Sequence, residues 1–401
     1  GAERPVCLRQ RQHGPNQPAA WTMRIAIVTE TYPPEINGVA LTVQGFVANL
    51  AALGHELLVV RPRQDVAPAA AAIPGVHELR LRGAGLPGYP GLRFGLPARA
   101  QLEREWRAWH PDAVYVATEG PLGWSAVRAA RALGIACATG FHTRFDDFAA
   151  HYGLGLLTPM VFAWLRRFHN LAGATLVPTR ELKQFLDRSG FRDVRLLPRG
   201  VDTGQFSPAR RDLALRRAWG LADEQLAVLC LGRMAPEKNL DLAVRSYRAI
   251  QRRVPGARFV WVGDGPALPA LKREHPDFVY CGMRRDADLA RHFASTDLFL
   301  FPSLTETFGN VTLEALASGV PLVAYDYGAA REHVRDGVHG RTIGCGDAAA
   351  FVAAAVELAD DAAARQRMRA AGRAAVAALS PQGVAADLAA LLASMATRRA
   401  A

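Results

Sequence analysis

The chain runs from Arg24-Ile-Ala-Ile-Val-Thr29, a short apolar run, into Glu30-Thr-Tyr-Pro-Pro-Glu-Ile-Asn-Gly38, which carries the residues typical of a loop. Apolar residues then recur at helical spacing between Val39 and Leu53. A buried strand, a loop and an amphipathic helix in this order form a βα unit. Such units build parallel sheets.

After this unit, alternating strands and helices continue along the chain in two series. Because strands alternate with helices, each series predicts a parallel, doubly wound sheet, and the fold class is α/β. The Pro- and Gly-bearing residues 198–208 separate the series, so we expect domains at 23–198 and 199–380, followed by a final helix at 381–398. Residues 1–22 are polar and without pattern, and we expect a disordered tail or a misassigned start, with Met23 as the first residue. The predicted strands are 24–29, 57–60, 113–117, 135–140 and 174–178, then 226–231, 258–262, 278–280, 298–301 and 321–324.

Composition narrows the class of protein. The net charge of +11 and pI near 9.9 favour anionic partners such as nucleic acid, a membrane surface or phosphorylated small molecules, although arginine on solvated surfaces explains the charge equally well. The five cysteines are scattered, which indicates reduced thiols rather than disulfides or zinc ligands. We find no apolar stretch near the roughly 20 residues that span a bilayer and no signal peptide, and therefore expect a cytoplasmic protein within reach of the inner membrane face.

The clearest chemical signal is the segment from Phe301 to Gly319, which predicts a strand end, a loop and a helix that begins near Gly309 or Asn310. Glu306 precedes this helix and Glu314 lies about one turn inside it, so both can face a ligand at the helix N-terminus. The N-terminus of a helix favours a phosphate, and the carboxylates can accept hydrogen bonds from sugar hydroxyls. When this segment is considered by itself, the simpler interpretation is that Glu306 offsets the helix dipole and that Glu314 lies on the surface.

A second signal follows the predicted strand 226–231, where Arg233 and Lys238 share one strand-to-helix loop. Two fixed cations can neutralise a diphosphate, and loops after parallel strands meet at one edge of a sheet. Gly38 and His142 follow strands of the first series. Plain turn and structural roles explain each of these four residues when it is considered singly. Dinucleotide, P-loop, metalloprotease and nucleophile-elbow motifs are missing from the sequence.

Together, Gly232-Arg-x4-Lys238-Asn, Val262-Gly-Asp-Gly-Pro266, Glu306-x7-Glu314 and the Asn37-Gly38-Val39 loop resemble family 4 of the retaining glycosyltransferases. The resemblance implies the GT-B fold, with two doubly wound domains facing each other across a cleft. The N-terminal domain would bind the acceptor, the C-terminal domain would bind a nucleotide-sugar donor, and the final helix would pack back on the N-terminal domain. No metal or other cofactor is expected.

The resemblance also implies roles for single residues. Arg233 and Lys238 would grip the donor diphosphate, which Gly38 approaches, and Glu314 would hold the ribose. His142 would lie near the reacting face of the sugar, and the acceptor would attack on the side that the leaving group vacates. The expected catalytic residues are His142, Glu306, Arg233 and Lys238. The transferred sugar would be held by Glu306, Thr307, Phe308, Gly309 and Asn310, and the nucleobase by Gly282, Met283 and Arg284.

Within the family, the sequence resembles two membrane-associated branches, which it does not distinguish. One contains GDP-mannose-dependent α-mannosyltransferases, and the other contains sulfoquinovosyl- and glucosyl-diacylglycerol synthases. We expect transfer of a hexosyl group, with GDP-mannose favoured over a UDP-sugar, to a lipid or glycan hydroxyl, and no nucleic-acid partner. The rival classes are a sugar-nucleotide epimerase, a pyridoxal-phosphate phosphorylase and a non-catalytic binding module.

Two segments of the first domain could contact an anionic membrane. Residues 80–94 interleave arginine with apolar and aromatic side chains, for which membrane contact and plain surface are equally good interpretations. In the predicted helix at 156–171, Met160, Trp164 and Phe168 form a stripe beside Arg166 and Arg167. Core packing is the simpler explanation of that stripe.

Overall fold

The computed structural model describes residues 9–10, 21–33, 35, 38–64, 73–85, 93–142, 158–235, 238–304, 306 and 308–400. The chain divides into two compact units. Unit 1 consists of Gly1–Pro198 and Pro381–Ala401, and unit 2 consists of Arg199–Ser380. Both divisions fall at the residues where the sequence analysis set its domain boundaries.

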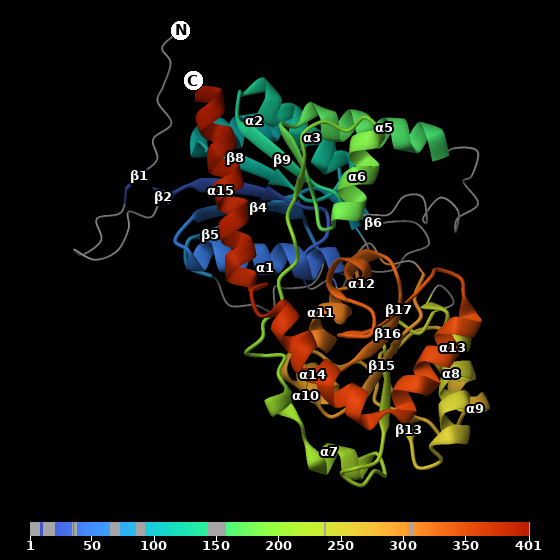
Figure 1. The fold of residues 1–401 in the computed structure, drawn as a ribbon. Helices are drawn as coiled ribbons and strands as arrows, with labels where there is room; N and C mark the ends of the chain where they lie inside the picture. Colours follow the sequence, from blue (N-terminus) through green and yellow to red (C-terminus); the bar gives the residue numbers. More distant parts are fainter. Residues whose placement is uncertain are drawn as a thin grey trace. The chain divides into compact units, whose positions relative to one another are not determined.

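Unit 1 is built on a seven-stranded sheet, ordered β11-β10-β9-β8-β3-β4-β5, in which every pairing is parallel (Figure 1). The strand order reverses between β3 and β8, so the loops after these strands diverge there. The strands are β3 (Arg24–Val28), β4 (Glu56–Pro62), β5 (Val76–Leu81), β8 (Ala113–Val116), β9 (Ala136–Gly140), β10 (Ala174–Val177) and β11 (Val194–Leu196).

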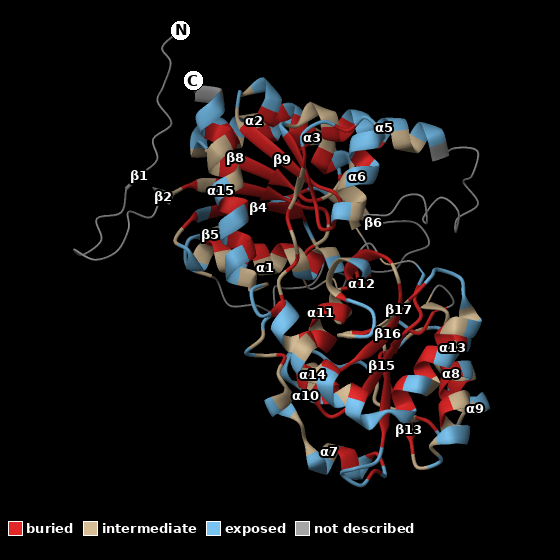
Figure 2. Ribbon diagram, in the orientation of Figure 1, coloured by how far each residue is buried: buried red, intermediate tan, exposed pale blue. Residues whose placement is uncertain are grey.

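Helices cover both faces of this sheet because its strands are apolar on both sides. Ile25 and Ile27 of β3 pack on one face with α1 and α15, whereas Ala26 and Val28 pack on the other face with α2 and α3. In Figure 2 the central strands are buried and the outer helix faces are exposed. The helices are α1 (Gly38–Ala52), α2 (Arg99–Trp109), α3 (Pro121–Ala132), α5 (Thr158–Leu171), α6 (Arg180–Arg188) and α15 (Pro381–Ala400).

Unit 2 has a six-stranded parallel sheet, ordered β14-β13-β12-β15-β16-β17, which reverses between β12 and β15. One face packs with α8 and α13, and the other packs with α10 and α11. The strands are β12 (Ala227–Leu231), β13 (Arg258–Val262), β14 (Val279–Tyr280), β15 (Leu298–Phe301), β16 (Leu322–Tyr325) and β17 (Gly340–Ile343). The helices are η1 (Pro208–Arg210), α7 (Leu213–Ala218), α8 (Leu240–Arg253), α9 (Leu268–Glu274), α10 (Asp286–Ala294), α11 (Asn310–Ala317), α12 (Gly328–His333), α13 (Ala348–Asp360) and α14 (Ala362–Val376).

The final helix lies on unit 1, as the resemblance implied. Leu388 and Leu392 of α15 are fully buried in the core beneath β3. The expectation that no segment is long and apolar enough to span a bilayer was wrong. Ala362–Arg398, which covers α14 and α15, contains a window of mean hydropathy 1.5 because it is rich in alanine. The buried leucines of α15 account for part of this apolar character by core packing.

Two further differences concern the N-terminal region. Arg9–Gln10 (β1) pairs antiparallel with Trp21–Thr22 (β2), inside the segment that we expected to be a disordered tail. A second short ladder joins β6 (Gly83–Gly85) to β7 (Arg93–Gly95), within the candidate membrane loop at 80–94. The centre of that loop, residues 86–92, lies outside the described residues.

Candidate active site

The polar residues singled out in unit 2 gather where its strand order reverses. Arg233 and Lys238 follow β12, and Glu306 follows β15, the strand beside it. In open parallel sheets, ligands bind beyond the carboxyl ends of the strands at this reversal point. The side chain of Asn239 links the two loops by donating a hydrogen bond to the carbonyl of Pro302 at 3.3 Å.

The two loops are also joined by an ion pair between the Lys238 ammonium and Glu306 Oε1. The hydroxyl of Ser303 donates to the same carboxylate oxygen at 2.9 Å. Tyr327 anchors the loop after β15 through two hydrogen bonds. Its hydroxyl donates to the Ser303 carbonyl at 2.7 Å and accepts from the Glu306 N–H at 3.1 Å. Two neighbours, Lys238 and Ser303, therefore fix the Glu306 carboxylate, and Tyr327 fixes the backbone of its loop.

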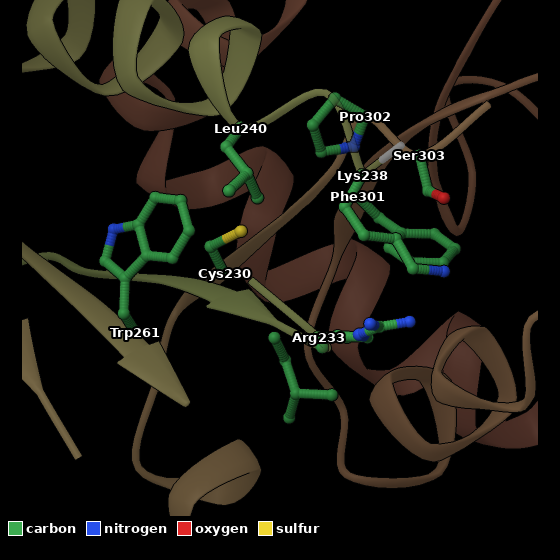
Figure 3. A pocket seen from close by; sticks show the side chains of 10 residues that line it. Cys230, Arg233, Lys238, Leu240, Trp261, Phe301, Pro302 and Ser303 are labelled. Carbon is green, nitrogen blue, oxygen red and sulfur yellow. The ribbon is translucent and has the colours of Figure 1, made fainter. Parts of the chain in front are cut away.

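A pocket lies between these loops and the sheet. Figure 3 shows Arg233, Lys238 and Ser303 on one side of it and Trp261, Leu240 and Cys230 on the other. Its volume of about 10 Å³ has room for about one water molecule, so the pocket marks where the two loops meet and does not by itself hold a ligand.

Two glycines of Val262-Gly-Asp-Gly-Pro266 support the Arg233 loop from behind. A Cβ on Gly263 would lie 2.0 Å from the Gly232 carbonyl oxygen, and one on Gly265 would lie 2.5 Å from the Met234 carbonyl oxygen. The loop after β13 therefore packs directly on the loop after β12, with the Met234 N–H donating to the Asp264 carbonyl at 2.9 Å. The glycine pair is accordingly explained by close backbone packing.

Helix α11 begins directly after the Glu306 loop. Gly309 caps it with φ at 88°, a left-handed conformation that favours glycine. Glu314 lies in the first part of this helix, and its Oε2 is buried without a hydrogen-bond partner among the described residues. Burial raises the pKa of Glu314 from 4.5 to about 7. An unpaired carboxylate beneath a helix N-terminus has its hydrogen-bonding capacity available for ligand hydroxyls.

The structure places some of the other residues that we predicted to bind the donor. Phe308 is buried in the core of unit 2, and its carbonyl accepts from the Ala329 N–H at 2.7 Å, so only its N–H can face a ligand. Asn310 is the first residue of α11, whereas Thr307 lies outside the described residues. Gly282, Met283 and Arg284 follow β14, two strands from β12. Their suggested role in reading the nucleobase stays a prediction.

His142 of unit 1 follows β9, and its Nε2 lies 2.9 Å from the hydroxyl of Tyr115 on β8. Gly140 makes room for this pair, because a Cβ there would lie 2.2 Å from the tyrosine oxygen and 2.4 Å from the histidine nitrogen. Gly38 begins α1, and a Cβ there would have no neighbour within 4 Å among the described residues. Packing within that part of the chain therefore gives no reason for glycine at position 38.

Sequence reasoning missed Glu30, which follows β3 at the reversal point of unit 1. Its Oε1 accepts hydrogen bonds from the N–H groups of Leu122 and Gly123 at 2.9 and 3.5 Å, at the start of α3. Burial nevertheless raises the pKa of Glu30 to about 7. Glu119 follows the neighbouring strand β8, and its Oε1 lies 3.6 Å from His169 Nε2. Both acids could have been found from the rule that polar residues directly after buried strands lie at the site edge.

The structure thus brings Arg233, Lys238 and Glu306 to the carboxyl edge of the unit 2 sheet, with Glu314 in the helix that follows, and brings His142 and Glu30 to the carboxyl edge of the unit 1 sheet. Among the described residues, no group of three or more His, Cys, Asp or Glu side chains is placed to hold a metal ion. Cys137, Cys230, Cys281 and Cys345 are not joined to one another by disulfides.

Comparison with known families gives two matches. A model described as Glycosyltransferase Family 4 matches residues 36–205, and a model described as Glycosyl transferases group 1 matches residues 225–361. Each match falls within one of the two structural units, apart from the few residues at the linker.

Among curated proteins, a GDP-mannose-dependent alpha-mannosyltransferase of Mycobacterium tuberculosis is 36% identical over 315 residues, covering 77% of this chain and 81% of the relative. A GDP-mannose-dependent alpha-(1-6)-phosphatidylinositol monomannoside mannosyltransferase of Mycolicibacterium smegmatis is 31% identical, covering 86% and 92%. An alpha-monoglucosyldiacylglycerol synthase of Streptococcus pneumoniae is 25% identical, covering 76% and 71%.

Among solved structures, a sucrose-phosphate synthase from Thermosynechococcus elongatus superposes with a TM-score of 0.73 at 18% identity, covering 93% of this chain and 99% of that one. At this identity the likeness concerns the fold, and it confirms the predicted GT-B class.

Proposed function

The chain belongs to glycosyltransferase family 4, and from that membership we propose that it transfers mannose from GDP-mannose to a hydroxyl of a lipid or glycan, with retention of configuration. The relatives at 36% and 31% identity are both named for GDP-mannose, which supports this donor. The name of the second includes phosphatidylinositol, which supports a lipid acceptor at the inner membrane face. UDP-sugar transfer to diacylglycerol is the alternative, supported by the 25% identical diacylglycerol glucosyltransferase relative.

One observation carries the proposal: cations and a fixed carboxylate meet on the loops after β12 and β15, and an unpaired carboxyl lies in the helix that follows β15. We assign the diphosphate to Arg233 and Lys238, the sugar hydroxyls to Glu306, and the ribose hydroxyls to Glu314. Breaking the sugar–phosphate bond increases the negative charge on the nucleoside diphosphate. Fixed cations stabilise that developing charge more than they stabilise the ground state, which lowers the barrier.

The ion pair between Lys238 and Glu306 couples the two roles. The carboxylate that we assign to the sugar also orients the ammonium that we assign to the phosphate. A side chain held in this way needs little reorganisation when charge develops. The incoming hydroxyl would attack on the face that the leaving group vacates and would pass its proton to the departing phosphate.

We further propose that no metal ion takes part, because Arg233 and Lys238 supply the positive charge that a divalent cation provides in other phosphate-transfer enzymes. Transfer should then proceed at an unchanged rate, within about twofold, after treatment with EDTA and gel filtration. A rate that falls at least about tenfold and is restored by added Mg²⁺ or Mn²⁺ would contradict this proposal.

The donor is tested by thermal unfolding of the full chain with GDP-mannose, UDP-glucose, ADP-glucose or no ligand. A ligand at about 100 times its dissociation constant stabilises the folded state by about 2.7 kcal/mol. Of the three sugar nucleotides, we expect only GDP-mannose to raise the melting temperature. Release of GDP should then depend on an added acceptor, offered as phosphatidylinositol or diacylglycerol in detergent micelles or as a soluble mannoside.

Glu306→Ala should abolish sugar transfer, and Glu274→Ala, on the exposed surface of α9, serves as the matched control. A stabilising effect of UDP-glucose but not GDP-mannose would establish the alternative donor. Full transfer activity in Glu306→Ala would refute the site assignment. GDP-mannose converted to an epimer without acceptor would indicate an epimerase.

A further inference from the structure

A second cavity lies in unit 1 on the helices α2, α3 and α5, which cover one face of its sheet (Figure 1). Its volume is about 630 Å³. It belongs to the helical layer of unit 1, and none of the residues assigned above to donor or catalysis lines it. We call it the arginine groove, and its lining residues are Arg99, Trp124, Arg128, Arg131, Ala132, Trp164, Arg167 and Leu171.

Three of the four arginines in the groove have no acidic partner among the described residues. Arg99 pairs with Glu103 at 2.7 Å. Arg128, Arg131 and Arg167 are exposed and form no ion pair within the part of the chain that the structure describes. Three neighbouring positive charges repel one another unless an anion lies between them. A guanidinium group binds a phosphate through two parallel hydrogen bonds, so a phosphate ester fits this groove.

Apolar side chains stand exposed beside these charges. Met160 and Trp164 of α5 are 70% and 41% exposed, whereas Phe168, one turn beyond Trp164, is fully buried. The Trp164 ring lies 5.4 Å from that of Trp124 and 6.3 Å from that of Phe168, measured between ring centroids. Core packing, the simpler sequence interpretation of this stripe, therefore holds for Phe168 and for the inner part of Trp164, but not for Met160 or for the outer part of the Trp164 ring.

We infer that the arginine groove binds the headgroup phosphates of an anionic phospholipid bilayer, with Met160 and Trp164 entering the interface beside it. Basic residues next to an exposed apolar strip are the combination that holds proteins on anionic membranes. Tryptophan favours the headgroup level, where its ring is half in water. Met160 favours a bilayer over nucleic acid, because an exposed thioether gains by burial among acyl chains and gains nothing from a polyanion in water.

The test is co-sedimentation of the full chain with vesicles of equal parts phosphatidylglycerol and phosphatidylcholine, compared with phosphatidylcholine alone. The wild type should bind only the anionic vesicles. Each basic residue at an anionic surface contributes roughly a fivefold factor to binding, so Arg128→Ala/Arg131→Ala/Arg167→Ala should lower the partition coefficient about 100-fold. Trp164→Ala should lower it at least about tenfold.

The matched controls remove equal charge and equal apolar exposure from unit 2. Arg210→Ala/Arg217→Ala/Arg252→Ala removes three exposed arginines, and Leu213→Ala removes a side chain that is also 41% exposed. Both should bind vesicles as the wild type does. The inference is overturned if the wild type ignores anionic vesicles, if the groove variant binds normally, or if the control triple loses as much binding as the groove triple.

Two measurements separate this inference from misfolding and from the proposed function. The groove variants should keep the wild-type unfolding transitions, and should transfer sugar normally to an acceptor in detergent micelles, because none of the changed residues is assigned to the reaction. Binding of single-stranded RNA more tightly than vesicles, lost in the groove triple and retained in the control triple, would make nucleic acid the occupant and would overturn the bilayer assignment.

Discussion

At the scale of single residues, Glu314 links the stability of unit 2 to pH. Burial raises its pKa from 4.5 to about 7, so between these values the folded state binds more protons than the unfolded state. The free energy of unfolding therefore falls as pH rises from 4.5 to 7, by up to about 3 kcal/mol. The stabilising contribution is complete below pH 4.5 and is lost above pH 7.

Glu314→Gln should remove this pH dependence, because an amide carries no charge to bury. The variant should unfold at a higher temperature than the wild type at pH 8 and at a similar temperature at pH 4.5. Its affinity for the donor should fall at least about tenfold, because an amide is a weaker acceptor for hydroxyls than a carboxylate. Thermal unfolding with and without GDP-mannose measures both effects.

The control for this substitution is Glu274→Gln, whose side chain is 61% exposed and which should change neither quantity. In the wild type, donor affinity should rise as pH increases through 7, because ionised Glu314 accepts hydrogen bonds more strongly. A Glu314→Gln protein that binds donor normally would remove Glu314 from the site.

Sequence reasoning identified the charged residues of unit 2 because each follows a recognisable strand. It could not identify the partners that fix them. Tyr327 meets Glu306 only through the three-dimensional fold, whereas Ser303 is a local partner, three residues earlier in the same loop. Tyr115 was equally hidden, since it lies inside a strand and reaches His142 across 27 residues of sequence. Long-range side-chain contacts leave no local pattern.

At the scale of secondary structure, Glu30 and Gly120 join the loop after β3 to the start of α3. A Cβ at Gly120 would lie 2.1 Å from Glu30 Oε2 and 2.2 Å from Oε1. Gly120→Ala should therefore displace the carboxylate and deprive the Leu122 and Gly123 N–H groups of their acceptor. We expect unit 1 to lose about 2–3 kcal/mol of stability. Urea unfolding followed by a signal specific to unit 1 measures it.

Gly45→Ala in α1 is the matched substitution, because a Cβ there would meet nothing within 4 Å among the described residues. Alanine in a helix interior should stabilise unit 1 by about 0.5–1 kcal/mol. If Gly120→Ala unfolds at the same urea concentration as the wild type, the carboxylate has an equally good alternative position and the argument for Gly120 fails.

Apart from the edge strand β14, the strands that sequence reasoning found are the buried ones. The segments 258–262 and 298–301 were predicted with the same bounds as β13 and β15. The missed strands β5, β11 and β17 are edge strands of the two sheets. β5 reads Val-His-Glu-Leu-Arg-Leu, and five of its six residues are at least partly exposed. A strand without a continuous apolar run carries no signal that separates it from a loop.

At the scale of the whole molecule, α15 belongs to unit 1 although it follows unit 2 in sequence. Val384, Leu388 and Leu392 are buried in the unit 1 core, and burial of each such side chain contributes about 1.5–3 kcal/mol. Their sum is comparable to the total stability of a domain. A chain that ends at Ser380 should therefore lose the unfolding transition of unit 1 and keep that of unit 2.

Differential scanning calorimetry tests this prediction, and hydrogen exchange identifies which unit has unfolded. Amides in β3 and β8 should exchange freely in the truncated chain, whereas those in β12 and β15 should stay protected. Protection of β3 in the truncated chain would show that α15 is dispensable for unit 1.

The return of α15 to unit 1 makes unit 2 an insertion whose two ends meet. The Val201 N–H donates to the Leu379 carbonyl at 2.8 Å, so the segment that enters unit 2 contacts the segment that leaves it. Residues 199–380 can thus be exchanged as one cassette, with unit 1 keeping its own last helix. If unit 2 binds the donor as proposed, a chimera that carries a relative's cassette should inherit that relative's nucleotide preference and keep the acceptor preference of its host.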